Sequence, residues 1–291
     1  MILVTGATGR LGSAVAGQLL RRIDAADIAI LVRDPAKAWD LAGRGVCVRV
    51  GDYDDTASLA RAMDGVNRVV MVASNQPQRR MQQHQDVIDA AVSAGVSVFG
   101  FTSRSLTDIE SSRNQLMRDY SGTEQLIQRS GLQSLIFRNA LYLDTLPNYF
   151  GGARVFREGI RAPAGKSTVA YALRREMGEA IANAIIDGDT RSQPFVLAAP
   201  RAYSMTDVAD GLSAAFGKPV DYQDVSEEEF VADAAARGLP DAVARRTLGF
   251  FADMHDGQLN QTSSDLGTLL GREPASLTEG LREVFAPTQV A

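Results

Sequence analysis

Residues 1–22 read MILVTGATGRLGSAVAGQLLRR, in which three glycines separate a short apolar run from an amphipathic stretch. Gly6 is placed to end a strand at a tight turn, Gly9 to let the backbone approach a phosphate, and Gly12 to let the next helix pack on the strand. The N-terminus of that helix, expected from about Leu11 to Ile23, offers free N–H groups to a pyrophosphate. The alternative is a glycine-rich turn that binds no ligand.

The glycine loop opens a long alternation of apolar runs and helical stretches. Apolar, β-rich runs fall at 2–5, 27–33, 46–50, 68–74, 97–103 and 132–139. Helical patterns lie between them and end at glycines, the usual stop signal. Strand–helix–strand repeats of this kind form a parallel sheet with helices on both faces. The sequence therefore predicts an α/β protein with a Rossmann-type doubly wound parallel sheet, the context in which a glycine loop binds a dinucleotide.

The alternation breaks after about Asn139. Residues 140–160 are irregular and aromatic, 175–188 form a helical pattern, 193–200 a strand pattern, and the chain from about 204 is mostly helical with one possible strand at 220–225. We expect residues 1–150 and about 165–200 to form the NAD(P)-binding domain. Residues of about 151–164 and 201–291 are expected to form a smaller, mostly helical and discontinuous substrate lobe.

Composition narrows the class of partner. The chain has 291 residues, a net charge of −5 and no basic block, which disfavours nucleic acid as a ligand. The single cysteine, Cys47, excludes a disulfide within the chain and is expected to be a buried, inert thiol. Cys47, His84 and His255 lack the spacing of a structural zinc site, so no metal is expected. Without a signal peptide or a membrane-spanning run, we expect a cytoplasmic protein.

Arg33 indicates which dinucleotide is bound. Folds that prefer NAD place Asp or Glu at the end of the second strand, to bind the ribose 2′-hydroxyl. Here Arg33 stands there, with Lys37 one helical turn later, and a guanidinium can bind the 2′-phosphate of NADPH. Asp34 is placed as an N-cap before Pro35. The alternative for Arg33 is a solvated surface charge.

Polar residues also follow the third and fourth strands. Asp52 is placed to accept a hydrogen bond from the adenine amino group; alternatively, Asp52 and Asp54 cap the next helix. Ala73 and Ser74 follow the fourth strand and are expected near the nicotinamide ribose. All these residues fall at the carboxyl ends of strands, where open α/β sheets bind ligands.

Seven stretches together resemble a known family: TGATGRLG at 5–12, VRDPAKA at 32–38, GDYDD at 51–55, TSRS at 102–105, GTEQLIQRSGL at 122–132, IFRNALY at 136–142 and APAGKSTVAYALRREMGEAIA at 162–182. They resemble the NmrA-like group of atypical short-chain dehydrogenases, and within it the bacterial quinone reductases and triphenylmethane dye reductases. The resemblance covers nearly the whole chain, although the last third matches mainly in layout. It implies an NADPH-dependent oxidoreductase.

The resemblance also implies site residues. Together with the residues chosen above, the cofactor-binding set is Gly6, Thr8, Gly9, Arg10, Leu11, Gly12, Arg33, Lys37, Asp52, Ala73, Ser74, Asn75, Thr102, Ser103, Asn139, Ala140, Leu141 and Tyr142. Ala164, Gly165 and Lys166 would border the substrate cleft. The catalytic candidates are Tyr120, Tyr142 and Asn139.

One departure from the pattern of ordinary short-chain dehydrogenases limits the reactions that this chain is expected to catalyse. Ordinary short-chain dehydrogenases use a Tyr-x-x-x-Lys pair, in which the lysine lowers the pKa of the tyrosine. Here Tyr120 is followed by Glu124 at the lysine position, and a carboxylate beside the phenol is expected to raise the pKa of Tyr120. This departure agrees with the quinone reductase group, which also lacks the pair. The alternative for Tyr120 is a partly buried helix residue.

Hydride transfer to a flat, electron-poor acceptor needs no tuned acid, because orientation can carry the catalysis. Four aromatic residues in the irregular segment are candidates for a wall of the substrate cleft: Tyr142, Tyr149, Phe150 and Phe156. Alternatively, they form the core of the small lobe. The full set of substrate-binding candidates is Tyr142, Tyr149, Phe150, Lys166 and His255. His255 is a candidate proton donor, and His84 is expected on a helix surface.

The leading hypothesis is an NADPH-dependent oxidoreductase that reduces quinone-like or other flat acceptors. The second is a non-catalytic NADP(H)-binding redox sensor that regulates a partner protein. A third is a biosynthetic reductase or isomerase, because a fold does not fix chemistry. The expected partner is a small aromatic or quinone-like molecule, with the protein a monomer or homodimer.

Overall fold

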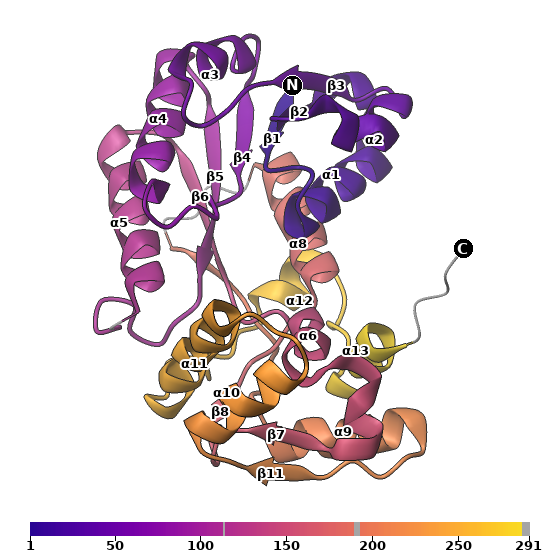
Figure 1. Cartoon of the computed structure of the whole chain (residues 1–291). Coiled ribbons are helices and arrows are strands. Elements are labelled where there is room, and N and C mark those ends of the chain that lie inside the picture. Colours follow the sequence, from indigo (N-terminus) through magenta and orange to yellow (C-terminus); the bar gives the residue numbers. More distant parts are fainter. Residues whose placement is uncertain (113, 189–192, 287–291) are drawn as a thin grey trace.

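The computed structural model describes residues 1–112, 114–188 and 193–286. Its main sheet has seven strands in the order β3-β2-β1-β4-β5-β6-β9, and all neighbouring strands are parallel (Figure 1). The strands are β1 (Ile2–Thr5), β2 (Ile28–Val32), β3 (Cys47–Val50), β4 (Arg68–Met71), β5 (Val98–Arg104), β6 (Ser134–Asn139) and β9 (Phe195–Leu197). The strand order reverses between β1 and β4, the point at which such sheets bind ligands. The predicted doubly wound parallel sheet is confirmed.

Strand β3 lies at the edge of the sheet and pairs only with β2. Residues of the central strands β1 and β2 are buried, whereas Cys47 of β3 is half-buried. The expectation of a buried thiol is therefore wrong, because an edge strand keeps part of its surface in contact with solvent.

Helices cover both faces of the sheet. On one face lie α1 (Arg10–Arg22), α8 (Arg174–Asp187) and α12 (Asp265–Leu270). On the other lie α3 (Thr56–Ala62), α4 (Arg80–Ser93) and α5 (Gln115–Ser130). Short elements flank β2: η1 (Ala25–Asp27), η2 (Pro35–Ala38) and α2 (Trp39–Gly43).

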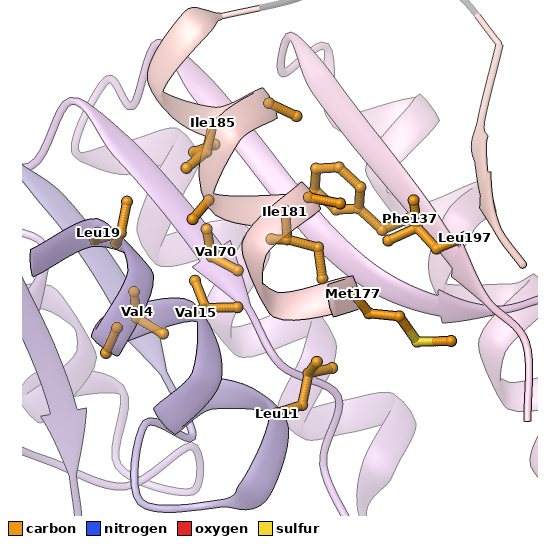
Figure 2. Close-up of a cluster of buried hydrophobic side chains, with 14 of the residues drawn as sticks. Val4, Leu11, Val15, Leu19, Val70, Phe137, Met177, Ile181, Ile185 and Leu197 are labelled. Atoms are coloured by element: carbon orange, nitrogen blue, oxygen red, sulfur yellow. The ribbon is translucent and has the colours of Figure 1, made fainter. Parts of the chain in front are cut away.

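Helices α1 and α8 cross closely, and buried side chains from both fill the space above the sheet (Figure 2). Val15 and Leu19 come from α1, Ile181 and Ile185 from α8. At the crossing, a Cβ added to Gly178 would lie 2.6 Å from the Cβ of Ala14. A glycine is therefore needed in α8 for this contact.

The remaining elements form a lobe with its own apolar core below the sheet (Figure 1). Its two small sheets are parallel β7 (Ile160–Ala162) with β11 (Tyr222–Asp224), and antiparallel β8 (Thr168–Val169) with β10 (Tyr203–Ser204). The strand predicted at 220–225 is β11. The helices are η3 (Leu143–Thr145), α6 (Leu146–Phe150), η4 (Gly152–Arg154), α7 (Val155–Glu158), α9 (Met205–Phe216), α10 (Glu227–Ala236), α11 (Asp241–His255) and α13 (Leu277–Phe285).

The late helix α12 returns to the main sheet, since Leu266 and Leu270 belong to the same core cluster as α1 and α8. The domain limits drawn from the sequence, at about 150, 165 and 200, stay a prediction. Across the described ranges, each helix is too short or too polar to cross a membrane.

Candidate functional site

The loop between β1 and α1 has the shape of an anion cradle. Gly6 has a φ of +60°, which favours glycine, and its carbonyl accepts a hydrogen bond from the N–H of Gly9 at 3.0 Å. A Cβ added to Gly12 would lie 2.3 Å from the oxygen of Gly6. Gly9 is the N-cap of α1 and has no side chain that could cap the helix, so the first N–H groups of the helix are available to an anion. The loop therefore fits a pyrophosphate.

A first cavity of about 400 Å³ lies beside this loop. It gathers residues from the carboxyl ends of β1, β2, β3 and β4, as expected for the reversal of strand order. Nine of the predicted cofactor-binding residues line it: Gly6, Thr8, Gly9, Arg33, Lys37, Asp52, Ala73, Ser74 and Asn75. Leu11 and Gly12 are buried beneath the loop, and Arg10 is exposed at the first turn of α1.

Two cations stand at one end of the first cavity. Arg33 and Lys37 are exposed, and neither forms an ion pair with a residue in the described ranges. Asp34 accepts a hydrogen bond from the N–H of Ala36 at 3.0 Å and caps η2, as predicted. The cap holds Asp34 in place, so the two cations remain available to a ligand phosphate.

Tyr53 lies on the floor of the first cavity. Its hydroxyl bonds to that of Thr5 and donates to the carbonyl of Val72 at 3.0 Å, which ties β1 to β4. Burial raises the pKa of Tyr53, while the charge of Arg33 acts to lower it. The ring is therefore a fixed neutral surface beside Arg33.

Asp52 lines the cavity but does not cap the next helix. Asp55 caps α3 instead, accepting from the N–H of Ser58 at 3.0 Å. Asp54 pairs with Arg79 at 2.9 Å. The capping alternative for Asp52 and Asp54 is wrong, which leaves the carboxylate of Asp52 at the cavity wall.

His84 fixes the loop after β4. Its Nε2 accepts from the N–H of Ser74 at 2.9 Å, and its Nδ1 lies 2.7 Å from the hydroxyl of Thr123, which donates to the carbonyl of Asp119 at 2.8 Å. The ring is therefore neutral with its proton on Nδ1. Burial, followed by the charge of Arg80, lowers the pKa of His84 to about 3. The expectation of a helix-surface residue is wrong, because the side chain of His84 is fully buried against Phe101 of β5 and Thr123 of α5.

A buried ion pair also holds this loop. Arg80 and Asp119 are 4% and 6% exposed at their side chains, with 2.6 Å between Nη1 and Oδ2. The Nε of Arg80 donates to the carbonyl of Ser74 at 2.9 Å. Sequence reasoning missed this pair, because its partners come from different helices and no local spacing marks them.

Glu124 does not contact Tyr120. It accepts from the hydroxyl of Ser103 and forms an ion pair with Arg138 at 2.6 Å. The pKa of Tyr120 is raised, as expected, but burial raises it rather than the carboxylate of Glu124. The predicted cause is therefore wrong: the side chain of Glu124 reaches β5 and β6 instead.

The predicted cofactor-binding residues at the ends of β5 and β6 are more deeply buried than most of those that line the first cavity. Thr102 accepts from the N–H of Ala73 at 3.1 Å and so positions the loop after β4. Asn139 is fully buried, and its amide donates to the hydroxyl of Tyr142 at 3.4 Å. In the described part of the chain its Oδ1 has no hydrogen-bond partner. Ala140 and Leu141 are buried beside it.

A second cavity of about 1120 Å³ lies between the sheet edge and α11. Ala73, Ser74 and Asn75 line both cavities, so the loop after β4 is their common wall. The other lining residues used below come from α4, α5 and α11: Arg80, Leu116, Tyr120, Phe250, Asp253 and His255. Sequence reasoning missed Phe250 and Asp253, because nothing local places α11 against α5.

The aromatic wall differs from the prediction. Phe150 is buried in the lobe core with Tyr149 packed against it, and Phe156 packs on Phe216 with 4.9 Å between ring centroids and the ring planes tilted by 59°. The core alternative is therefore correct for these three, because the short helices of 146–158 turn their apolar faces inward. Lys166 is exposed and does not line the second cavity.

His255 lines the second cavity. Its Nε2 lies 3.0 Å from the carbonyl oxygen of Pro163, and its Nδ1 lies 3.5 Å from the hydroxyl of Ser167. A carbonyl can only accept, so the proton is on Nε2 and is already donated. The ring anchors α11 to the Pro163–Ser167 turn rather than presenting a free proton to the cavity.

Comparisons with known proteins cover nearly the whole chain. The NmrA-like family matches residues 1–267. Quinone oxidoreductase 2 of Escherichia coli (strain K12) is 34% identical over 287 residues, which are 98% of this chain and 99% of that protein.

Two solved structures have the same fold over almost their full length. The NADPH complex of the E. coli quinone oxidoreductase QOR2 aligns with a TM-score of 0.88 and 32% identity, over 98% of this chain and 100% of that one. The NADP(H) complex of triphenylmethane reductase from Citrobacter sp. aligns with a TM-score of 0.92 and 31% identity, over the same shares.

Proposed function

This chain belongs to the NmrA-like family, and we propose that it is a reductase that uses NADPH to reduce flat, quinone-like acceptors. The single observation that carries the proposal is the shared wall of two cavities, formed by Ala73, Ser74 and Asn75. One cavity ends at the glycine loop and the other at α11. A dinucleotide in the first would bring its reactive end to the wall of the second.

The first cavity fits NADPH by the chemistry of its lining. The uncapped start of α1 suits the pyrophosphate, and Arg33 with Lys37 suits the 2′-phosphate. Tyr53 and Asp52 offer a neutral ring and a carboxylate to the adenine. NADPH bound there supplies a hydride, and the residues of the chain determine what can receive it.

The second cavity fits a flat acceptor. Leu116, Tyr120 and Phe250 line it, and Ala73 forms its boundary with the first cavity. Burial raises the pKa of Tyr120, and no lysine stands one turn away to lower it. Reduction of an ordinary ketone is therefore disfavoured, whereas a quinone accepts a hydride as a delocalised anion and takes its proton from water.

The test is NADPH oxidation by the purified chain with 1,4-benzoquinone, 1,4-naphthoquinone and a triphenylmethane dye, followed at 340 nm. We expect turnover with the quinones and none with cyclohexanone. Failure to oxidise NADPH with every quinone and dye would contradict the proposal. If NADP(H) then bound tightly, with different affinities for its two redox forms, the redox-sensor hypothesis would replace it.

A further inference from the structure

The guanidinium of Arg80 lies in the wall of the second cavity, next to the boundary between the two cavities. Arg80 lines the second cavity but not the first, so it approaches that boundary from the second cavity. Its Nε donates to the carbonyl of Ser74 at 2.9 Å, and Ser74 belongs to the wall that both cavities share. A flat molecule that rests on this shared wall therefore comes within reach of the guanidinium.

The guanidinium is held at two of its nitrogen atoms. Besides the bond from Nε to the shared wall, Nη1 donates to Oδ2 of Asp119 at 2.6 Å, and both side chains are buried. The other carboxylate oxygen of Asp119 accepts from Nε2 of Gln115 at 2.7 Å, so the carboxylate is itself fixed. The orientation of Arg80 is thus set before any ligand binds, as electrostatic stabilisation of a transition state requires.

The third nitrogen of Arg80, Nη2, has no hydrogen-bond partner in the described part of the chain. It is not enclosed either, because the enclosed side-chain atoms that lack a partner in the described ranges belong to Asn139, Tyr171 and Arg237. The side chain of Arg80 is only 4% exposed, and the second cavity is the one of the two that it lines. Its remaining accessible surface therefore faces that cavity, and the N–H groups of Nη2 are left to hydrogen-bond a ligand.

Arg80 acts as a directed donor rather than as an excess of positive charge. Asp119 balances its charge, and the other charged residues that line the second cavity are two arginines and three carboxylates: Arg245, Arg246, Glu227, Asp253 and Asp256. The lining is therefore not net positive and does not attract anions in general. Nη2 instead offers a charge-assisted hydrogen bond at one place, which strengthens as negative charge forms on an oxygen there.

We propose that Arg80 is a catalytic residue that donates from Nη2 to an oxygen of the acceptor and stabilises the oxyanion formed by hydride transfer. The proposal rests on the proposed function. A quinone that receives a hydride gains two electrons and one proton, and leaves as the hydroquinone monoanion until water protonates it. One of its two oxygens then carries the new negative charge. Crystal violet, a triphenylmethane dye without oxygen, accepts the hydride on carbon and offers Arg80 no atom to bind.

The first experiment needs no turnover. The chain is titrated with 4-nitrophenol, whose yellow phenolate form mimics the oxyanion, and 1,4-naphthoquinone is added as a competitor to show that both bind in the same cavity. We expect the phenolate to bind at least about tenfold more tightly than the neutral phenol. Arg80→Lys should lose most of this preference, because a single ammonium group that pairs with Asp119 leaves the position of Nη2 empty.

Two results of this titration would overturn the proposal. One is equal binding of the phenol and the phenolate by the unaltered chain, or no binding of either, and it does not depend on the folding of a variant. The other is a preference that is lost in Tyr120→Phe and kept in Arg80→Lys, which would assign the oxyanion to the hydroxyl of Tyr120 in the same cavity wall.

The second experiment compares kcat and KM for 1,4-naphthoquinone and crystal violet. In Arg80→Lys, kcat for the quinone should fall at least about tenfold more than kcat for the dye, with little change in either KM, because the donor acts on charge that forms during the transfer. The matched control is Thr102→Val, which removes the hydrogen bond from the N–H of Ala73 and so loosens the same loop at another point. Thr102→Val should affect the two acceptors alike.

An equal fall for both acceptors in Arg80→Lys would show that Arg80 only holds the loop, and would overturn the proposal. If the unaltered chain reduced no acceptor, the proposed function would fail. The titration with 4-nitrophenol would then still decide whether Arg80 binds an oxyanion.

Discussion

The backbone N–H of Ser74 donates to Nε2 of His84 at 2.9 Å, so a buried neutral histidine holds the loop that both cavities share. In this loop Ser74 is half-buried and Asn75 is exposed. Three hydrogen bonds hold the loop: from the N–H of Ser74 to Nε2 of His84, from Nε of Arg80 to the carbonyl of Ser74, and from the N–H of Ala73 to the hydroxyl of Thr102. Protonation of His84 would remove the acceptor and release the loop.

Stability should fall in acid because of His84. Its pKa is lowered to about 3 in the folded chain, against 6.5 when unfolded, so the unfolded chain takes up a proton between these values and the folded chain does not. The free energy of unfolding should therefore fall as pH drops below 6.5, by about 2 kcal/mol from this group at pH 5. Urea unfolding at pH 7, 6 and 5 measures it. His84→Gln should show a shallower pH dependence, and an unchanged slope would contradict the assignment.

Arg33→Ala should weaken the preference for NADPH over NADH. Loss of the guanidinium removes a charge-assisted contact with the 2′-phosphate, so NADPH affinity should fall about 10- to 100-fold while NADH affinity changes little. Fluorescence titration with both cofactors measures the ratio. Arg61→Ala on α3, an exposed arginine outside both cavities, is the matched control. A ratio that stays the same in Arg33→Ala would mean that Arg33 is only a surface charge.

Two glycines of α1 should respond in opposite ways. In Gly12→Ala the new Cβ would lie 2.3 Å from the carbonyl oxygen of Gly6, so the loop must shift; we expect a loss of about 1–3 kcal/mol and of NADPH binding. Gly17 has no atom within 4 Å of its added Cβ, so Gly17→Ala should be neutral or add about 0.5–1 kcal/mol. Chemical unfolding and cofactor titration distinguish them. Equal behaviour of the two variants would argue against a close packing of loop and helix.

Glu124→Lys should not create a ketone reductase. It restores the Tyr-x-x-x-Lys pattern with Tyr120, but the side chain at 124 reaches Ser103 and Arg138 rather than the phenol. The lysine would face Arg138, so we expect a loss of about 1–3 kcal/mol and no activity on cyclohexanone. Glu124→Gln, which keeps the shape and loses the charge, is the control. Ketone reduction by the lysine variant would show that the position does reach Tyr120.

The fold and the first cavity were largely predictable, because their determinants are local. The strand that precedes Gly6, the helix that follows Gly12, and the chain positions of Arg33 and Asp52 at strand ends can each be read within a few residues. Parallel strands then bring those ends to one edge of the sheet, whatever the rest of the chain does.

The second cavity was not predictable in the same way. The roles of His84 and Arg80 depend on partners in α5, and Asp253 and Phe250 reach the site only because α11 packs against it. The aromatic residues 149, 150 and 156 have the composition of a binding wall, yet they fill the lobe core. Periodicity shows that a side chain is apolar or charged, but not which of two apolar surfaces it will meet.

The sequence by itself determined the parallel sheet, the glycine cradle and the cationic end of the first cavity, since hydrophobic pattern, glycine positions and strand ends depend on neighbours in the chain. Only the tertiary structure decided that His84 is buried and neutral and that Glu124 turns away from Tyr120. Burial and charge pairing depend on groups brought together from distant parts of the chain, and their free energies are therefore set by packing rather than by local sequence.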